Sequence, residues 1–246
     1  MTAIILLHAF PLHRQMWSAQ HEALEAAGHQ VFSPDFRGYG GNRVPAMPQL
    51  QSLDVLADDL SAFLDEHGLN QAVIGGLSLG GYVALAFLRR YPNRVAGLVL
   101  ADTRATADDD AVKQVRRQFA NRVEAEGIGW VAEAMMPGLL NEHHRRDRPD
   151  LVALVSGWIA GADPHAVAWT QRSIANRADT MDYLREFRGP ALVMVGAQDA
   201  MTPPESALAM VAALHGARYR EIEDSAHLSA IEAPQAVSDA IIQWLQ

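Results

Sequence analysis

The chain has 246 residues, of which 49% are hydrophobic and 20% charged, a balance that fits an ordinary folded domain and excludes a disordered or collagen-like chain. Acidic residues outnumber basic ones by 29 to 20, and no basic cluster offsets the net charge of −9, so we expect no nucleic-acid partner. The absence of cysteine excludes disulfides, thiolate metal sites and a cysteine nucleophile. The N-terminal apolar run is shorter than a signal-peptide core and no run approaches the ~20 residues of a membrane helix, so a cytoplasmic protein without a membrane partner is expected.

Short buried strands alternate with amphipathic helices in the first part of the chain. Each strand is a continuous apolar run, as in parallel sheets with both faces covered, whereas the helix before Gly68 has leucines recurring at intervals of three and four. This alternation requires a parallel sheet with helices on both faces. Strands are expected at residues 4–7, 30–34, 72–75 and 95–100, and helices at residues 13–27, 53–67 and 82–91.

The alternation stops after the fourth strand and resumes near the C-terminus. The intervening segment shows only helical periodicity, which predicts a helical lid inserted into one α/β core. We expect the core to comprise residues 1–102 and 189–246 and the lid residues 103–188. Within the second part of the core, strands are expected at residues 191–195 and 218–222, and helices at residues 204–214 and 234–245.

A Gly-x-Ser-x-Gly motif at residues 76–80 stands between a predicted strand and a predicted helix, as a nucleophile elbow requires. The sharp turn pushes the serine hydroxyl out above the sheet, and the glycines let the strand and helix backbones approach each other. The helix N-terminus adds free amide donors and a dipole that favours negative charge. The motif in this position predicts Ser78 as a nucleophile and the Leu79 amide as one donor of an oxyanion hole.

A serine nucleophile needs a base, and in a sheet of this kind the base comes from a loop after the last strand. His215 precedes Gly216 at a predicted helix end, where a histidine caps carbonyl groups. His227 follows the last predicted strand and opens a loop, so we predict it as the base. His8 lies at the opposite end of the chain and is expected to bridge loops.

The carboxylate that orients the base is expected on a loop after an intermediate strand, in the chain order serine, acid, histidine. Asp199 meets this requirement because it closely follows the strand at residues 191–195. Asp102 follows the preceding strand and is the alternative acid. Asp224 is too close to His227 in the sequence to hold its ring and is expected to be a solvated loop residue.

The loop after the first strand is expected to supply the second oxyanion donor. In this loop Pro11 restrains Phe10 to an extended backbone, which fixes the direction of the Phe10 amide. We therefore predict the Phe10 N–H as the second donor.

No metal or cofactor site is predicted. Residues 142–144, a glutamate followed by two histidines, and the acidic run at residues 108–110 lack a partner pair at ligand spacing and are expected to be solvated faces or helix ends. No glycine pattern of the dinucleotide-binding or Walker type follows a strand, so no nucleotide cofactor is expected.

With these motifs, the sequence resembles the α/β-hydrolase superfamily over nearly the whole chain. Within the superfamily it most resembles the group that holds 3-oxoadipate enol-lactonases, small carboxylesterases and cofactor-free haloperoxidases. The resemblance implies an α/β-hydrolase fold. Members usually begin with a β-hairpin that is missing here, so the sheet should have about six strands and be mostly or wholly parallel. The family's usual glycine in the first loop is Ala9 in this chain. The matching segments are residues 8–12, 35–40, 76–81, 196–199 and 226–234.

The predicted function is hydrolysis of a small carboxylic ester or lactone through an acyl-enzyme intermediate, without a cofactor, by a monomer or homodimer. The lid should decide the substrate. Its residues Trp130, Met135, Met136 and Leu139 are candidates for the apolar wall of a pocket, with plain helix packing as the alternative for each. A lyase or C–C hydrolase with the same triad, and a slow-turnover ligand sensor with the same fold, are the alternative functions.

Overall fold

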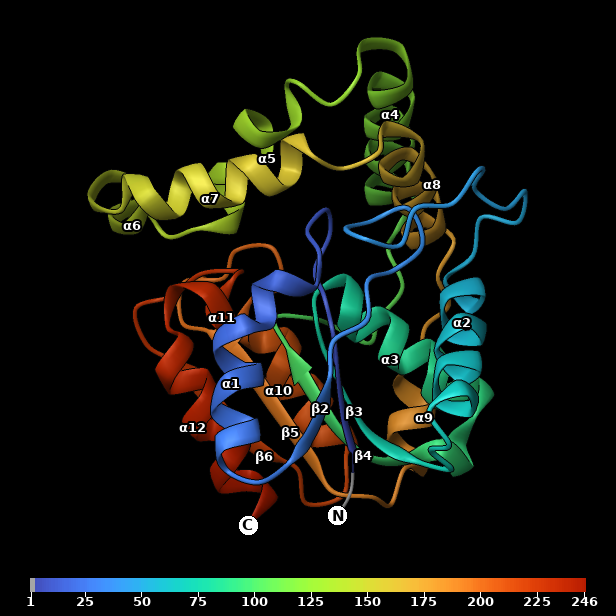
Figure 1. Cartoon of the computed structure of the whole chain (residues 1–246), viewed down its shortest axis with the longest axis vertical. Coiled ribbons are helices and arrows are strands. Elements are labelled where there is room, and N and C mark those ends of the chain that lie inside the picture. Colours follow the sequence, from blue (N-terminus) through green and yellow to red (C-terminus); the bar gives the residue numbers. More distant parts are fainter. Residues whose placement is uncertain (1–2) are drawn as a thin grey trace.

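The computed structural model describes residues 3–246, which form one six-stranded parallel sheet with helices on both faces (Figure 1). This architecture confirms the predicted fold class. The strand order is β2-β1-β3-β4-β5-β6, and every neighbouring pair is parallel. The strands are β1 (Ala3–Leu7), β2 (Gln30–Phe32), β3 (Ala72–Leu77), β4 (Val95–Ala101), β5 (Ala191–Gly196) and β6 (Arg218–Ile222).

The centre of the sheet explains why its strands are continuous apolar runs. All residues of β1 and β3 are buried, because helices cover both faces. The chain runs outward from β1 to β2 and then crosses back to β3 on the other side of β1. At such a reversal the loops at the carboxyl ends of the strands diverge and leave a crevice for ligands. The loop after β1 and the turn after β3 flank this point.

Two layers of helices enclose the sheet. Helices α1 and α12 pack against each other on one face, whereas α2, α3, α9 and α10 cover the other face (Figure 1). The sequence predicts that helix α3 begins at residue 82, but it begins at Leu79. Gly80 and Gly81 fit into its first turn. The short α11 was not predicted. The core helices are α1 (Ser18–Ala26), α2 (Leu53–Glu66), α3 (Leu79–Arg90), α9 (Met181–Glu186), α10 (Pro204–Ala213), α11 (Ser229–Glu232) and α12 (Pro234–Leu245), with short 3₁₀ helices at Arg14–Trp17 and Pro92–Arg94.

A helical insertion lies above the carboxyl ends of the strands (Figure 1). Within it α4 packs along α8, and α5 along α7. The segment predicted as the lid extends to residue 188, but its last helix, α9, packs against α3 and α10 beside the sheet. The helices above the sheet are α4 (Asp110–Glu126), α5 (Val131–Leu139), α6 (Glu142–Asp147), α7 (Pro149–Ala160) and α8 (Pro164–Ala175).

A search for membrane-spanning helices in residues 3–246 finds no single helix that is both long and apolar enough. Helices α7 and α8 pass the length and composition test only as a pair, and they are bent by 93° relative to each other.

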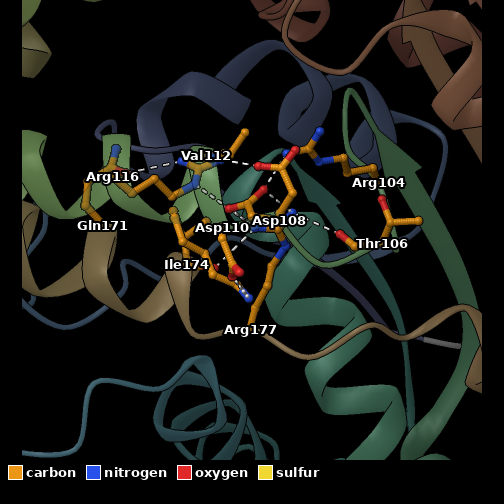
Figure 2. A network of polar contacts seen from close by, with 11 residues as sticks. Arg104, Thr106, Asp108, Asp110, Val112, Arg116, Gln171, Ile174 and Arg177 are labelled. Carbon is orange, nitrogen blue, oxygen red and sulfur yellow. Dashed lines mark hydrogen bonds and ion pairs between the residues drawn. The ribbon is translucent and has the colours of Figure 1, made fainter.

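A buried carboxylate ties the insertion to the core (Figure 2). Asp108, between β4 and α4, has a side chain that is 0% exposed. It accepts hydrogen bonds from Arg104, from Nε of Arg116 at 2.6 Å, and from both Nη atoms of Arg177 at 2.6 and 2.9 Å. The Arg177 guanidinium also lies 4.3 Å from the ring centroid of Tyr82 in α3. Three guanidinium groups from different segments therefore converge on one carboxylate.

The prediction that the acidic run at residues 108–110 lies on solvated faces or helix ends is only partly right. Asp109 is the N-cap of α4 and accepts a hydrogen bond from the Val112 amide at 2.8 Å, and the Asp110 side chain is fully exposed. For Asp108 the prediction is wrong, because its arginine partners are brought to it by the tertiary fold.

Candidate active site

Ser78 occupies a sharp turn between β3 and α3. Its backbone has a φ of +54°, a left-handed conformation that costs a non-glycine residue roughly 1–3 kcal/mol and is kept only where the surroundings enforce it. A Cβ atom on Gly76 would lie 2.1 Å from the carbonyl carbon of Gly80, and one on Gly80 would lie 2.1 Å from the Leu7 oxygen. Both glycines are therefore needed for strand and helix to approach this closely.

Hydrogen bonds from three directions hold the turn in place. The Ser78 amide donates to the Ala101 carbonyl at 3.0 Å. The Ser78 carbonyl accepts from the Tyr82 amide and from the Thr103 hydroxyl, each at 3.0 Å. The backbone is thus fully bonded, while the half-buried side chain remains available.

Ser78, His227 and Asp199 meet in the structure, although the sequence separates them widely. The Ser78 Oγ lies 2.8 Å from Nε2 of His227, and Nδ1 of the same ring lies 2.9 Å from Oδ2 of Asp199. His227 and Asp199 are buried. The order serine, imidazole, carboxylate is the geometry of a nucleophile, a base and the group that orients the base.

The turn after Asp199 holds its carboxylate. Oδ1 accepts hydrogen bonds from the amides of Met201 at 2.8 Å and Thr202 at 3.0 Å, and Oδ2 accepts from the Thr202 hydroxyl at 2.6 Å. Thr202 was not among the residues predicted from the sequence. Aspartate side chains commonly accept hydrogen bonds from backbone amides two residues further on, so a local signal for this turn was present.

The charges of the pair favour an ionised acid and a basic imidazole. Burial acts against the charged form of each group. For Asp199 the neighbouring His227 and the Thr202 hydrogen bonds outweigh burial and lower the pKa. For His227 burial lowers the pKa, but the charge and hydrogen bond of Asp199 outweigh it and raise the pKa above its ordinary 6.5. An imidazole with a raised pKa is a stronger proton acceptor.

The two predicted oxyanion donors lie on the loops that flank the reversal of strand order. Leu79 is the first residue of α3, and Phe10 follows β1 closely. Within residues 3–246 neither amide donates a hydrogen bond to a protein acceptor. The adjacent Ala9 amide, by contrast, donates to the Met16 sulfur at 3.0 Å. Two free amides are therefore left for a substrate oxygen, and their role as an oxyanion hole stays a prediction.

His8 bridges loops, as expected. Its Nε2 accepts a hydrogen bond from the Phe36 amide at 3.0 Å, so Nδ1 carries the proton and donates to the Ala9 carbonyl at 2.9 Å. Burial lowers the pKa of His8 to about 4, and the ring stays neutral at physiological pH. It holds the loop that presents Phe10.

Asp102, the alternative acid, makes different contacts. It follows β4 with a φ of +45°. Its Oδ1 accepts from the Gly196 amide at 2.7 Å, and Oδ2 is hydrogen-bonded to the Ser229 hydroxyl. The His227 ring is paired with Asp199 instead. Asp102 thus joins the last residue of β5 to the first residue of α11.

The predicted pocket residues lie on α5 and just before it. Leu139 is buried, and its carbonyl accepts a hydrogen bond from the Leu228 amide, next to His227, at 3.1 Å. The half-buried Trp130 packs on Phe119 of α4 with ring centroids 4.8 Å apart, and Phe119 in turn lies 6.2 Å from Phe10.

This row of aromatic rings connects the insertion to the loop after β1. Phe119 was not predicted as a site residue, because nothing in the sequence of α4 indicates which residue it contacts. Met136 is buried and Met135 is half-buried in α5. Whether these residues and Trp130 line a substrate pocket stays a prediction.

The expectation of no metal site at residues 142–144 rests on sequence spacing, in which the two histidines at residues 143 and 144 have no partner, and it stays untested. Asp224, from the loop after β6, lies beside them, and one ligand atom from each of the three residues lies within 4.8 Å of the others. The third group comes from a distant part of the chain, so sequence spacing could not reveal it.

Comparisons with known proteins identify the family and the fold. A family model described as alpha/beta hydrolase fold matches residues 2–234. A malate-bound esterase structure from Thermogutta terrifontis is 41% identical, with a TM-score of 0.95 over 100% of this chain and 89% of the other. The 3-oxoadipate enol-lactonase 2 of Acinetobacter baylyi is 26% identical over 97% of this chain and 86% of its own length. A Mycobacterium tuberculosis protein named as a non-heme bromoperoxidase is 29% identical over 92% and 86%. The resemblance inferred from the sequence is confirmed.

Proposed function

Because the chain belongs to the α/β-hydrolase family, we propose that it is a serine hydrolase that cleaves a carboxylic ester or lactone through an acyl-enzyme intermediate. Ser78 is the nucleophile, His227 the general base and Asp199 the group that orients the base. The observation that carries the proposal is the continuous hydrogen-bonded chain from Asp199 Oδ2 through both nitrogens of His227 to Ser78 Oγ, with distances of 2.9 and 2.8 Å.

In the first half of the reaction Ser78 Oγ attacks the carbonyl carbon while His227 Nε2 takes the hydroxyl proton. The imidazolium that forms is stabilised by Asp199, whose lowered pKa keeps it ionised. The carbonyl oxygen gains negative charge and accepts hydrogen bonds from the Phe10 and Leu79 amides. A donor of this kind contributes about 3 kcal/mol to transition-state stabilisation.

In the second half the tetrahedral intermediate collapses, the alkoxide leaves, and it takes the proton from His227. Water then enters, and His227 removes one of its protons as the oxygen attacks the acyl carbon. Collapse of this second intermediate releases the carboxylic acid and returns the proton to Ser78. For a lactone the alkoxide and the acid are two ends of one product.

Several features support an ester or lactone as the substrate. Relatives over nearly the whole chain are named as an esterase and an enol-lactonase. The aromatic row from Phe10 through Phe119 to Trp130 places apolar surface between the insertion and the loop after β1. We therefore expect a small to medium apolar acyl or alcohol group. Rates on p-nitrophenyl esters of increasing chain length test this, and activity only on charged acids would contradict it.

The alternatives weighed from the sequence, a lyase or C–C hydrolase and a slow-turnover sensor, use the same three residues. Product analysis separates the first from an esterase, because only ester or lactone hydrolysis adds water across a C–O bond. Fast ester turnover that Ser78→Ala abolishes argues against the sensor. Action as a monomer or homodimer in the cytoplasm stays a prediction.

The experiment that tests the nucleophile is labelling with a fluorophosphonate, followed by mass spectrometry of the modified peptide. We expect the adduct on Ser78 and no labelling of Ser78→Ala. Ser18→Ala is the matched control, because Ser18 is exposed and bonds only to the Gln15 carbonyl of its own turn. An adduct on another serine, or equal labelling of Ser78→Ala, would contradict the proposal.

A further inference from the structure

A cluster of metal-ligating groups lies where the insertion meets the loop that carries His227. His143 and His144 are the second and third residues of α6, and Asp224 lies in the loop after β6. The Oδ2 atom of Asp224 lies 3.2 Å from Nε2 of His143 and 3.8 Å from Nε2 of His144. The two imidazole rings lie side by side, with centroids 4.3 Å apart.

These separations match those between ligands that share a small metal ion. In a tetrahedral zinc site with bonds of about 2.0–2.1 Å, ligand atoms lie about 3.4 Å from one another. The two distances from Asp224 Oδ2, 3.2 and 3.8 Å, bracket that value. Two imidazole nitrogens and a carboxylate oxygen are a common set of three protein ligands for zinc, with the fourth position left to water.

A buried carboxylate behind the cluster orients one of the ligands. Glu232 of α11, whose side chain is 0% exposed, places Oε1 2.9 Å from Nδ1 of His144. The carboxylate accepts this hydrogen bond, so Nδ1 carries the proton, and Nε2, which lies 3.8 Å from Asp224 Oδ2, is left with the lone pair. A carboxylate bonded to the far nitrogen of a ligating histidine is the usual outer partner of zinc.

The same carboxylate links the cluster to the candidate active site. Besides His144, Glu232 accepts hydrogen bonds from the Asn141 amide at 2.7 Å and from the Ala226 amide at 2.6 Å. Ala226 directly precedes His227. Asn141, the N-cap of α6, also donates from Nδ2 to the Asp224 carbonyl at 2.8 Å.

Backbone conformation and a hydrogen bond fix the position of Asp224. Its φ is +58°, a conformation that aspartate tolerates better than most residues, and the Asn141 side chain holds it there. The side chains of Asp224 and His143 are 64% and 37% exposed, which gives an ion access from solvent.

We propose that His143, His144 and Asp224 bind one Zn²⁺, or a similar borderline divalent transition metal, that fastens α6 to the loop carrying His227. Imidazole and carboxylate ligands suit zinc, copper and nickel better than calcium or magnesium, which prefer oxygen ligands alone. The three protein ligands leave the fourth position of the ion to water, and the site does not depend on the proposed hydrolytic function. The competing explanation is a plain ion pair between protonated histidines and Asp224.

Titration of the chelator-treated full chain with ZnCl₂ in a calorimeter decides between the two. We expect one Zn²⁺ per chain and a rise in the thermal unfolding temperature with added zinc. Asp224→Asn and His143→Gln should each weaken binding at least ~10-fold, because loss of only an outer hydrogen-bonding partner already costs roughly that much. His165→Gln, which removes an exposed histidine of α8, should bind as the wild type does.

Hydrogen exchange supplies an independent readout. Zinc should slow exchange of amides at residues 141–147 and 224–228 together in the wild type, and it should leave them unchanged in Asp224→Asn. The proposal would be overturned if the wild type bound no zinc, or if Asp224→Asn and His143→Gln bound it as tightly as the wild type does. The ion pair would then remain as the explanation. Labelling of Ser78 by fluorophosphonate does not require zinc, so failure of one proposal is distinguishable from failure of the other.

Discussion

Asp102 and Asp108 both lie in the segment between β4 and α4, and both are buried, yet their environments shift their pKa values in opposite directions. Burial, followed by the nearby negative charge of Asp199, raises the pKa of Asp102 to about 8. Burial also acts to raise the pKa of Asp108, but hydrogen bonds and charges from Arg177 and Arg116 outweigh it and hold this pKa well below its usual range.

The contrast shows that partners, rather than burial, decide whether a buried carboxyl is charged. Asp102 meets an amide and a hydroxyl, neither of which carries charge, so it stays protonated at neutral pH. It can therefore lie near Asp199 without adding a second negative charge beside His227. Asp108 meets guanidinium groups and stays ionised, which suits an anchor between insertion and core (Figure 2).

The largest expected effect tests which aspartate orients the base. Asp199→Asn should lower kcat for ester hydrolysis by about 10⁴-fold, because the amide favours the wrong tautomer of His227 and cannot stabilise the imidazolium. Asp102→Asn is the matched comparison, since Asp102 is the alternative acid and is already neutral at pH 7. Steady-state rates on p-nitrophenyl acetate measure both. If Asp102→Asn shows the large loss and Asp199→Asn does not, the assignment is wrong.

The second effect concerns stability. Asp108→Asn leaves the guanidinium groups of Arg104, Arg116 and Arg177 facing a neutral amide and should lower the free energy of unfolding by about 3 kcal/mol. Asp110→Asn should change it by less than ~0.5 kcal/mol, because the Asp110 side chain is fully exposed. Urea unfolding at neutral pH gives both values. Equal midpoints for the two variants would show that the buried network does not stabilise the fold.

A smaller effect, the pH dependence of the free energy of unfolding, distinguishes a protonated Asp102 from a charged one. The folded-state pKa of about 8 exceeds the ordinary 3.8, so the folded protein binds more protons than the unfolded chain between these values. Wild-type stability should therefore fall as the pH rises through this window, by at most ~1.4 kcal/mol per pH unit.

Asp102→Asn removes this dependence while keeping an acceptor for the Gly196 amide and a polar group beside the Ser229 hydroxyl. The difference in unfolding free energy between variant and wild type should thus grow in favour of the variant from pH 5 to pH 8. A constant difference would mean that Asp102 is ionised throughout the range.

The sequence predicts those features that depend on local residue patterns or on the order of elements along the chain. The parallel sheet follows from short apolar runs alternating with helices. Ser78 follows from a glycine motif between strand and helix, and His227 and Asp199 follow from where their loops come after strands. Each inference needs only neighbouring residues and the order of elements.

Contacts between distant segments could not be predicted in this way. From the sequence, Asp108 is predicted to be part of an acidic surface run, but in the fold it pairs with Arg177. Asp224 is an exposed loop residue, as expected, but its contact with His143 of α6 could not be predicted from the sequence. In both cases the partner lies in another element, and sequence spacing contains no information about which elements meet. Burial and metal-ligand geometry are tertiary properties.

The smallest effect tests the charge beside His227 directly. The base must be neutral to accept the Ser78 proton, so kcat/KM should fall as the pH drops through the pKa of His227, which lies above its ordinary 6.5. In Asp199→Asn burial acts without the opposing carboxylate, so this limb of the residual activity should move to lower pH. Asp102→Asn should move the limb less, because Asp102 is mostly protonated below its pKa of about 8 and raises the pKa of His227 less than Asp199 does. A limb that moves equally in both variants would mean that the two aspartates act on His227 alike, and the contrast between a neutral and an ionised buried carboxyl would not extend to the active site.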